Sequence, residues 1–399
     1  MYCVQNVTPD IFWVGGSDRR IALFENIFPL TDGVMYNSYL IVDEKTVLMD
    51  TVDRSVTAQF FENVEHALAG RKLDYLVVNH MEPDHCFAIG DIVRRWPEVQ
   101  VVGNKKTFQM MNQFFQFQSA VQQLEVIEGD SLSIGKHTLN FYLAPFVHWP
   151  EAMVTYESET KTLFAADAFG SFGGFSGNLF ADQVDFDRDW LDDARRYYTN
   201  IVGKYGQQVQ TALKKLSGLD IARICPLHGL IWREDLGYIL NKYNQWSSYT
   251  PETEGVVIAY ASMYGDTENA AHILAGMLSQ KGIHNIRMFD VSKTHPSYII
   301  AEIFKNSHLV IACPTYNLEI YPTMELLLTE MKMLNVQKRK VALIANGTWA
   351  PRACKLIMER LEEMKMEPVC EPFTITSGLK DDQVTVLQKI ADDITASFN

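Results

Sequence analysis

The apolar positions in the first part of the chain alternate between strand-like and helix-like spacing. Short runs rich in β-branched and aromatic residues predict strands at Ile11–Val14, Tyr39–Val42 and Thr46–Met49. A longer stretch with helical spacing over 56–69 predicts a helix, and the apolar run Leu73–Val78 predicts a further strand. This mixture is typical of an α/β domain.

The same kind of pattern continues to about residue 250. It predicts one long helical region at Trp190–Leu216 and further strands at Gln100–Val102, Leu139–Leu143, Met153–Tyr156, Thr162–Ala166 and Ile221–Ile224. Polar, turn-rich sequence from Ser247 to Gly255 then predicts a linker. The glycine-rich segment Gly173–Gly177 has no strand-to-helix switch around it, and we interpret it as a flexible loop.

After the linker, continuous apolar strands alternate with helices. The strands are predicted at Val256–Tyr260, His308–Ala312 and Val341–Ala345, and the helices that follow them lie near 268–280, 324–333 and 352–364. Apolar strands with intervening helices are typical of a doubly wound parallel sheet. The chain therefore divides into two predicted domains, residues 1–250 and 251–399.

Composition narrows the class of protein. The 399 residues are 47% hydrophobic, and 35 Lys and Arg stand against 49 Asp and Glu, a net charge of −14. This disfavours nucleic acid or an anionic membrane as a partner, because phosphate contacts need clustered cations. No apolar stretch approaches the ~18 residues of a membrane-spanning helix, and the N-terminus lacks the pattern of a signal peptide. The six cysteines form no CxxC pair and indicate free thiols in a reducing cytoplasm.

Candidate metal ligands stand at the ends of predicted strands. They are four histidines and three acids: His80, Glu82, Asp84, His85, His148, Asp167 and His228. These side chains suffice for two metal ions if one carboxylate bridges them, and positions remain open for a substrate. Nitrogen and oxygen ligands without thiolate favour iron, manganese or zinc and argue against an iron–sulfur cluster. We place the loop 173–177 beside this site.

The second domain carries a separate candidate site at the loops that follow its strands. The first loop, residues 262–267, is a turn with hydroxyl groups and glycine between a strand and a helix, an arrangement that binds phosphate. The alternative is a plain helix N-cap at Thr267. Two further loops favour a ligand, because open α/β sheets bind ligands at the carboxyl ends of their strands. The candidate residues are Ser262, Met263, Tyr264, Gly265, Asp266, Thr267, Pro314, Thr315, Tyr316, Asn317, Asn346, Gly347, Thr348 and Trp349.

The run His80-Met81-Glu82-Pro83-Asp84-His85 resembles the HxHxDH motif of the metallo-β-lactamase superfamily, with Glu82 in place of the second histidine. In that superfamily the exchange to HxExDH is typical of the flavodiiron proteins, and the resemblance, including the order of the two domains, spans nearly the whole chain. It implies an α/β fold of two parts. A metallo-β-lactamase-like αβ/βα sandwich would be followed by a flavodoxin-like doubly wound parallel sheet.

The resemblance also implies a role for each candidate residue. One iron would be held by His80, Glu82 and His148, and the other by Asp84, His85 and His228, with Asp167 bridging them. A second carboxylate in place of an imidazole stabilises higher-valent iron. The loop 262–267 looks like the flavodoxin loop that binds the FMN phosphate, and Tyr316 or Trp349 would stack on the flavin ring.

Members of this family reduce O2 to water or NO to N2O at the diiron site, using electrons relayed through FMN. Two irons and one flavin store four electrons, which is the number that O2 reduction needs. The resemblance implies a cytoplasmic enzyme with a separate electron donor (a rubredoxin, a reduced deazaflavin or a flavoprotein reductase), because the chain ends soon after the flavodoxin-like domain. It further implies a head-to-tail homodimer or a dimer of such dimers, in which the flavin of one subunit abuts the diiron site of the other.

The sequence departs from the family at two places. Glu25 stands where many members carry a histidine beside the substrate pocket, so the resemblance does not decide between O2 and NO. Asp266, in a loop that lacks the tryptophan of the family, places an acid near the expected phosphate. Trp149 follows the ligand His148 and is a candidate apolar wall of the substrate pocket.

Two other functions compete with this interpretation. A zinc-dependent hydrolase with a flavodoxin-like appendage would use a metal-activated hydroxide, but such hydrolases usually keep a histidine at the position of Glu82. A non-catalytic electron carrier or redox sensor would need a structural metal site closed by protein ligands. Seven ligands for two ions leave coordination positions open instead.

Overall fold

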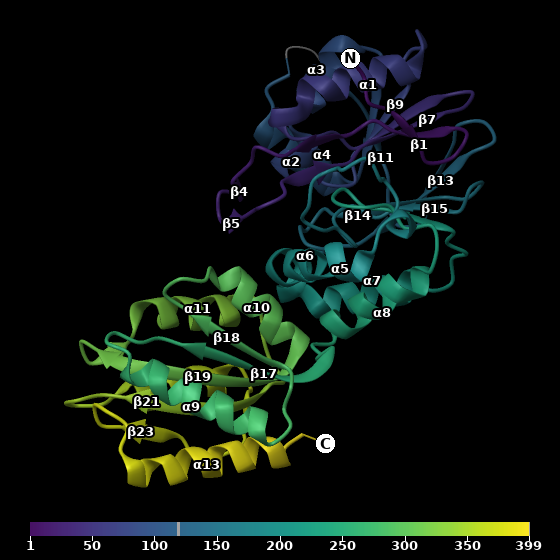
Figure 1. Cartoon of the computed structure of the whole chain (residues 1–399). Helices are drawn as coiled ribbons and strands as arrows, with labels where there is room; N and C mark the ends of the chain where they lie inside the picture. The colour runs from purple at the N-terminus through teal and green to yellow at the C-terminus, as the bar shows by residue number, and fades with distance from the viewer. Residues whose placement is uncertain (118–119, 399) are drawn as a thin grey trace. The chain divides into compact units, whose positions relative to one another are not determined.

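Two α/β units make up the chain in a computed structural model that describes residues 1–117 and 120–398 (Figure 1). The first unit contains Met1–Tyr198 and Tyr205–Asn244, and the second contains Thr199–Lys204 together with the chain from Gln245 onward. No helix among the described residues has the length and apolar character needed to cross a membrane.

The first unit is a sandwich of two β-sheets. One sheet has the order β1-β2-β7-β8-β9-β10-β11, and the other has the order β12-β13-β14-β15-β16. The rings of Tyr39 and Phe164, from facing strands of the two sheets, lie 5.4 Å apart. The strands are β1 Gln5–Asn6, β2 Ile11–Trp13, β7 Tyr39–Val42, β8 Thr46–Met49, β9 Tyr75–Val77, β10 Gln100–Gly103, β11 Gln122–Glu125, β12 Ser131–Ser133, β13 Thr138–Leu143, β14 Met153–Glu157, β15 Thr162–Phe164 and β16 Arg223–Cys225.

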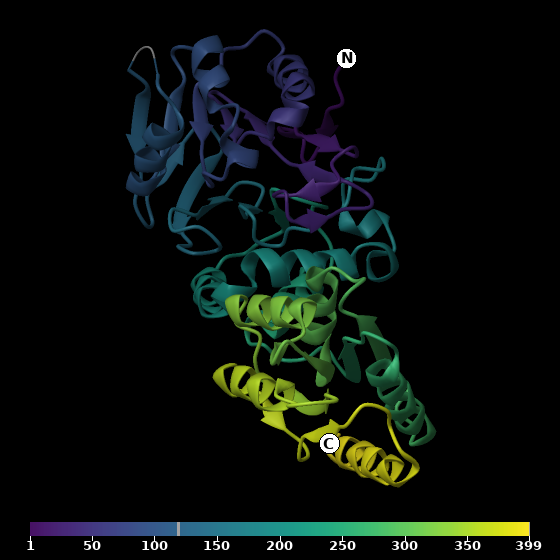
Figure 2. The same ribbon diagram turned by 90° about the vertical axis from the view of Figure 1, so that its left-hand side faces the viewer.

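Helices cover both outer faces of this sandwich (Figure 2). They are α1 Thr57–Leu68, α2 Pro83–Cys86, α3 Ile89–Arg95, α4 Lys105–Phe114, α5 Phe186–Asp189, α6 Leu191–Tyr197, α7 Gly206–Leu216 and α8 Leu236–Ser247. Two small ladders complete the unit. Strand β3 (Gly16–Asp18) pairs with β6 (Val34–Tyr36), and β4 (Leu23–Phe24) forms a hairpin with β5 (Phe28–Pro29). The predicted αβ/βα sandwich is confirmed.

The helical region predicted over Trp190–Leu216 is confirmed, but it is not one continuous α-helix. Helix α6 ends at Tyr197, a π-helical turn and a 3₁₀ turn cover Tyr198–Tyr205, and α7 begins at Gly206. This interruption contains β-branched residues and one glycine, Gly203, which are weak helix formers. It is also where the chain passes into the second unit and back. Hydrophobic spacing alone did not reveal this excursion.

Two loop predictions also need correction. The linker is shorter than predicted, because Thr253–Gly255 already belong to strand β17, in which Thr253 pairs with Asn306. The segment Gly173–Gly177 is tied down at several points. Gly173 donates to the Gly33 carbonyl, and the carbonyls of Gly174 and Phe175 accept hydrogen bonds from the Arg19 guanidinium.

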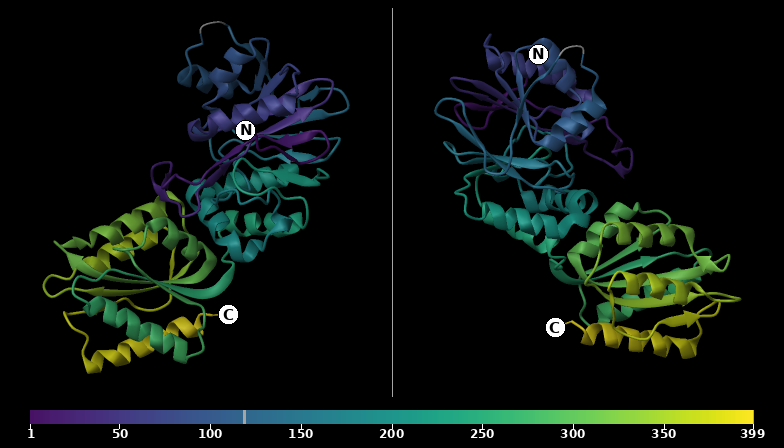
Figure 3. Two further views of the ribbon diagram at one scale, coloured as in Figure 1. Left: turned by 45° about the horizontal axis from the view of Figure 1, so that its top comes forward. Right: turned by 180° about the vertical axis from the view of Figure 1, so that it is seen from behind.

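The second unit is built on a parallel sheet with the order β18-β17-β19-β21-β22, in which β23 also pairs with β21. This is the 2-1-3-4-5 order of the flavodoxin-like doubly wound fold, and it confirms the predicted architecture. The strands are β17 Thr253–Tyr260, β18 Ile286–Asp290, β19 Asn306–Tyr316, β20 Glu319–Ile320, β21 Lys340–Asn346, β22 Glu367–Pro368 and β23 Phe373–Ile375. The helices are α9 Asp266–Gln280, α10 Pro296–Lys305, α11 Pro322–Met333, α12 Ala353–Glu363 and α13 Asp381–Ala396 (Figure 3).

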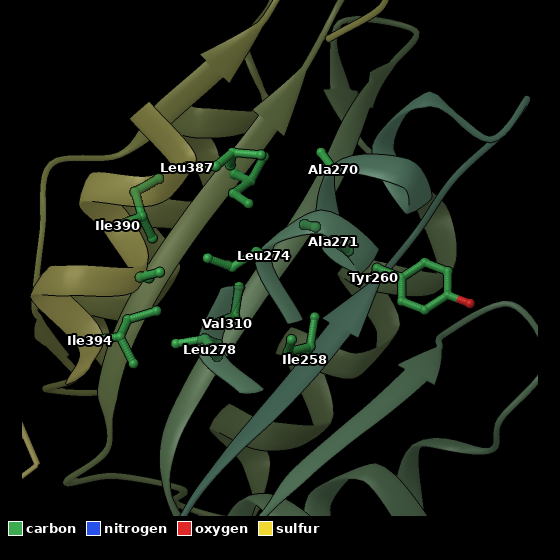
Figure 4. Close-up of a cluster of buried hydrophobic side chains, with 14 of the residues drawn as sticks. Ile258, Tyr260, Ala270, Ala271, Leu274, Leu278, Val310, Leu387, Ile390 and Ile394 are labelled. Atoms are coloured by element: carbon green, nitrogen blue, oxygen red, sulfur yellow. The ribbon is translucent and has the colours of Figure 1, made fainter. Parts of the chain in front are cut away.

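One face of this sheet packs against α9 and α13. Alternate residues of the strands, among them Ile258 and Val310, are buried there together with Leu274 of α9 and with Leu387 and Ile390 of α13. Figure 4 shows these side chains gathered between the two helices and the sheet. Because this core fixes the strands, it also fixes the loops that leave their carboxyl ends.

Replacing Leu274 by Ala should destabilise the second unit. The side chain is fully buried, and removing it leaves a cavity that costs about 3 kcal/mol. Peptides from α9 and β17 should then exchange amide hydrogens roughly 100-fold faster, as measured by mass spectrometry, while peptides from β7 and β8 keep their wild-type rates. Ser279→Ala, at an exposed position of the same helix, is the matched control. Unchanged exchange in the Leu274 variant would show that this core does not limit opening.

Candidate functional site

A tight loop after β9 carries four of the predicted ligands. Proline at position 83 begins the short helix α2, as it often does at the first helical position. The Asp50 carboxylate, at the end of β8, accepts the backbone N–H groups of Asn79 (2.7 Å) and His80 (3.1 Å). Thr51 donates both its N–H (2.9 Å) and its hydroxyl (2.6 Å) to the His85 carbonyl. Both ends of the ligand loop are thus hydrogen-bonded to the residues that directly follow β8.

The remaining predicted ligands come from the second sheet of the sandwich. His148 precedes β14, Asp167 follows β15 and His228 follows β16. All seven side chains meet at one end of the two sheets. The potential ligand atoms within each of two groups lie within 4.8 Å of one another, and the groups are His80, Glu82, His148 and Asp167, and Asp84, His85 and His228.

Asp167 reaches both groups. Its Oδ2 lies 3.1 Å from His148 Nε2 and 3.5 Å from His80 Nε2. Its Oδ1 lies 3.3 Å from His85 Nε2 and 3.8 Å from His228 Nε2. A carboxylate that turns one oxygen to each group has the geometry of a bridging ligand.

In the second group, two imidazoles face each other. The Nε2 atoms of His85 and His228 are 2.9 Å apart, and Asp84 Oδ2 lies 3.3 Å and 3.2 Å from them. His228 Nδ1 is 2.7 Å from the Met35 carbonyl oxygen. That nitrogen therefore donates, and Nε2 of the neutral ring presents its lone pair. Lone pairs that converge on one buried point fit a cation.

Electrostatics support the same conclusion. Burial disfavours a charged imidazole, but the facing carboxylates outweigh it and raise the pKa of His148 to about 9 and that of His85 to about 10. Burial and Asp84 oppose the ionisation of Glu82, yet its histidine partners lower its pKa to about 2. Both oxygens of Asp84 and Oδ1 of Asp167 are buried without a hydrogen-bond partner among the described residues. Buried carboxylates in this state are satisfied by coordinating metal, so the residues present fit two metal ions.

A further carboxylate, Glu151, stands behind the first group. Its Oε1 is 2.9 Å from His80 Nδ1 and accepts the N–H of Met81 at 2.8 Å, and the residue is 1% exposed. A carboxylate on the far nitrogen of a ligand histidine fixes its tautomer and ring orientation. Glu151 is not among the residues predicted from the sequence. An acid three residues after the ligand His148 was the available signal.

A pocket of about 720 Å³ opens beside the ligands Glu82 and Asp84. Glu25 lines it from the tip of the β4–β5 hairpin. The residue as a whole is exposed, but its carboxyl group lies inside the pocket, where burial and the neighbouring Glu82 raise its pKa to about 8. Trp149 packs on the other side of the first group, with its ring 5.6 Å from that of His80 and perpendicular to it.

The predicted loops of the second unit meet around one pocket of about 270 Å³. Every candidate residue predicted there lines it except Gly265, and Leu318 and Ser377 line it as well. Gly265 instead makes the turn before α9, with a φ of +101° that favours glycine. Leu318 and Ser377 gave no signal in the sequence, because the first lies beyond the polar loop and the second on a later strand end.

The start of α9 decides between the two interpretations of loop 262–267. Thr267 lies inside the first turn of the helix and its hydroxyl accepts a hydrogen bond from Asn346 (3.3 Å), so the interpretation as a Thr267 N-cap is wrong. Among the described residues no side chain caps this helix. An uncapped helix N-terminus that faces a pocket fits a phosphate group. The exposed rings of Tyr264 and Trp349 offer flat surfaces to a planar ligand.

Replacing Glu151 by Gln should weaken metal binding. The change keeps the shape of the side chain but removes the charge behind His80, and loss of such a partner costs about 10- to 100-fold in affinity. Titration of metal-free protein with Fe²⁺ measures the effect. Glu157→Gln is the matched control, because Glu157 is equally buried and lies 3.0 Å from Nδ1 of a histidine, His137, outside the two groups. Equal affinities for both variants would contradict the role of Glu151.

Comparison with known proteins agrees with both units. Residues 34–229 match a family described as ODP family beta lactamase, and residues 258–389 match the flavodoxin family. The chain is 34% identical over 370 residues to a protein named nitric oxide reductase from Moorella thermoacetica, an alignment that covers 92% of this chain and 91% of that protein.

Solved structures share the fold. The rubredoxin oxygen:oxidoreductase from Desulfovibrio gigas matches with a TM-score of 0.93 at 27% identity, over 99% of this chain and 98% of that one. The flavodiiron protein from Giardia intestinalis matches in fold with a TM-score of 0.93 at 24% identity, over 99% and 96% of the two chains. With Glu82 in the ligand motif and a flavodoxin unit after the lactamase-like one, this chain belongs to the flavodiiron protein family.

Proposed function

We propose that this chain is an oxidoreductase that reduces O2 to water, NO to N2O, or both, with electrons relayed through FMN. One observation carries the proposal. Seven candidate nitrogen and oxygen ligands, shared between two groups by Asp167, occur in the same chain as a flavodoxin unit with a pocket at the ends of its strands. Residues 1–250 would form the diiron domain and residues 251–399 the FMN-binding domain.

In this proposal each group of ligands holds one iron. His80, Glu82 and His148 would bind the first, Asp84, His85 and His228 the second, and Asp167 both. When bound, the irons supply redox electrons and open coordination positions for a diatomic gas. The protein's own part is to hold the ligands: Asp167 sets the separation of the two groups, and Glu151 orients His80.

The pocket next to the ligands has an apolar wall that limits water near the reacting gas. Phe24 is 2% exposed, and its ring lies 5.3 Å from that of His228 and perpendicular to it. Trp149 shields the opposite group. We place Glu25 in the pocket as well, where it replaces the histidine found in many members of the family.

In the second unit, the proposed FMN would place its phosphate at loop 262–267 and its ring between the other two loops. Hydrogen bonds hold these loops in register. Asn346 donates to the Ser377 carbonyl (2.8 Å), and Thr315 Oγ1 accepts the N–H groups of Arg352 and Ala353 (3.0 Å each). Tyr264, Tyr316 or Trp349 would stack on the flavin, since the ring of each is exposed beside the pocket.

Electrons would come from a separate donor. The name of the Desulfovibrio gigas relative points to rubredoxin as the donor of that protein, and for this chain we propose a rubredoxin, a reduced deazaflavin or a flavoprotein reductase. All six cysteines are free thiols, which supports a cytoplasmic location.

Assembly as a head-to-tail homodimer, or as a dimer of such dimers, would bring the flavin of one subunit to the irons of another. Exposed apolar side chains at both pockets support it: Leu23 and Ile27 stand on the hairpin beside the metal ligands, and Met263, Tyr264 and Trp349 surround the FMN pocket. Large apolar side chains left exposed around a site mark interaction surfaces.

The competing function, a zinc-dependent hydrolase, is not favoured. The named relatives are a nitric oxide reductase and an oxygen oxidoreductase. A hydrolase also gives no role to a second unit that carries a ligand pocket at the ends of its strands.

Replacing Asp167 by Ala tests the proposed function. Because each of its oxygens faces one group of ligands, its loss should release iron and lower the turnover of both O2 and NO by about 100-fold or more. Iron per chain and stopped-flow mixing of the reduced protein with each gas are the measurements, and wild-type rates rank the two gases. Asp220→Ala, which removes an exposed acid paired with Lys161, is the control. A variant with two irons and wild-type turnover would refute the bridge.

Mixing two inactive variants tests the dimer. One variant carries His80→Ala and His85→Ala, and the other carries Ser262→Ala and Thr267→Ala and is checked to be free of flavin. Random exchange gives heterodimers with one intact flavin–diiron pair each, so about a quarter of the wild-type rate should return. If exchange is demonstrated by mass and no activity returns, electrons pass within one chain and the proposed arrangement is wrong.

A further inference from the structure

The pocket beside the metal ligands has two chemically different walls. The β4–β5 hairpin contributes the apolar side chains of Leu23 and Phe24, with Glu25 at its tip. A polar wall contains Asp18, Tyr36 and Asp53 among others. An apolar wall suits a diatomic gas. The polar wall has no role in the function proposed above, although the ligand Asp84 lines the same pocket.

Strand pairing places Asp18 and Tyr36 on the same face. Gly16 pairs with Tyr36 and Asp18 with Val34 in the antiparallel ladder of β3 and β6. Because residues two apart on a strand share a face, Asp18 is the diagonal neighbour of Tyr36 on that face. The position opposite Tyr36 is glycine, where a Cβ atom would come within 2.7 Å of Val56. The 3₁₀ turn Arg54–Val56 therefore packs closely on this face.

That turn brings two more polar groups to the same wall. Asp53 caps it by accepting the N–H of Ser55 at 2.7 Å, and Asp53 and Ser55 both line the pocket. Arg20, 82% exposed in its side chain, lies 3.5 Å from Asp18 and marks the outer end of the wall. Acids and hydroxyls thus line the pocket from its mouth inward.

Tyr36 forms the inner end of this wall. The residue is 2% exposed, and its ring lies 5.6 Å from that of His228 and 6.5 Å from that of His85. Its strand is fixed against the ligands, because the carbonyl of Met35, the preceding residue, holds His228.

We infer that the wall formed by Tyr36, Asp18, Asp53 and Ser55 is the route by which protons enter the diiron site. This inference rests on the proposed function. Reduction of O2 to two waters consumes four electrons and four protons, and reduction of two NO to N2O and water consumes two of each. The electrons come from the donor through the flavin, and the protons come from bulk water.

The relay needs no ionised tyrosine. The Tyr36 O–H bond breaks as its proton passes to the oxygen of the substrate being reduced. A new O–H bond forms as the same phenol oxygen takes a proton from water or from the Asp53 carboxyl group. The phenol is neutral before and after each transfer, and water in the pocket spans the gaps between polar groups. Donation by a positioned group of this kind contributes about 10²- to 10⁴-fold to a rate.

Tyr36→Phe removes the hydroxyl and keeps the ring against His85 and His228. With the flavin-loaded, iron-loaded enzyme, kcat should fall by about 10-fold or more, KM for the gas should stay the same, and the ratio of rates in H2O and D2O should rise. Asp53→Asn, which retains an acceptor for the cap, should act in the same direction and add little in the double variant, since both lie on one path. Tyr156→Phe, which deletes a hydroxyl bonded to the Asp220 carbonyl, should change none of these values.

Other outcomes overturn the inference. The inference is overturned if Tyr36→Phe keeps the wild-type kcat and the wild-type isotope ratio. It is also overturned if kcat falls and the isotope ratio does not change, because that result indicates a packing role. If Tyr36→Phe loses iron, Asp53→Asn decides, because its carboxylate lies outside the two ligand groups, and a wild-type isotope ratio there refutes the route. Failure of the proposed function looks different: the loaded wild-type enzyme then turns over neither gas, and the inferred route falls with it.

Discussion

The Asp167 carboxylate is the group around which the first unit is organised, because each of its oxygens faces a different pair of histidines. The site gathers three carboxylates and four imidazoles in one small buried space. The carboxylates repel one another there, and some of their oxygens lack a hydrogen-bond partner within the described part of the chain, unless cations lie among them. The surrounding structure therefore has to hold them in place against that tendency. Asp50, Glu151 and the Met35 carbonyl do so by fixing the ligand loop, His80 and His228.

The two-sheet sandwich explains why ligands so far apart in sequence can meet. Its strands present their ends at one edge, and the connections after β9, β15 and β16 each need only a short turn to turn a side chain inward. The second unit uses the same principle in a different sheet. Parallel strands β17, β19 and β21 end side by side, so three loops form one pocket. Both sites are thus products of strand ends, and the core beneath them supplies rigidity.

A site that reduces a gas must receive electrons, protons and the gas itself. In the pocket beside the ligands, the gas and the protons would contact chemically different side chains. Phe24 and Leu23 give the pocket apolar surface, whereas Tyr36 and Ser55 give it hydroxyl groups with exchangeable hydrogen, beside the carboxylates of Asp18 and Asp53. The separation has a physical advantage. Water and acids along the polar wall can deliver protons, while the apolar wall limits the access of bulk water to the gas.

The sequence by itself determined the ligand types, their order, the class of both units and most strands, because these depend on local spacing: the run from His80 to His85 after an apolar strand is visible without a structure. Tertiary structure alone decided the rest. That Glu151 supports His80 and that Tyr36 joins Asp18 on one face both depend on contacts between distant strands. The break between Tyr197 and Gly206 was likewise hidden, because a helical pattern does not reveal a chain that crosses into another unit. Local propensity is a property of neighbours in sequence, whereas a site is a property of neighbours in space.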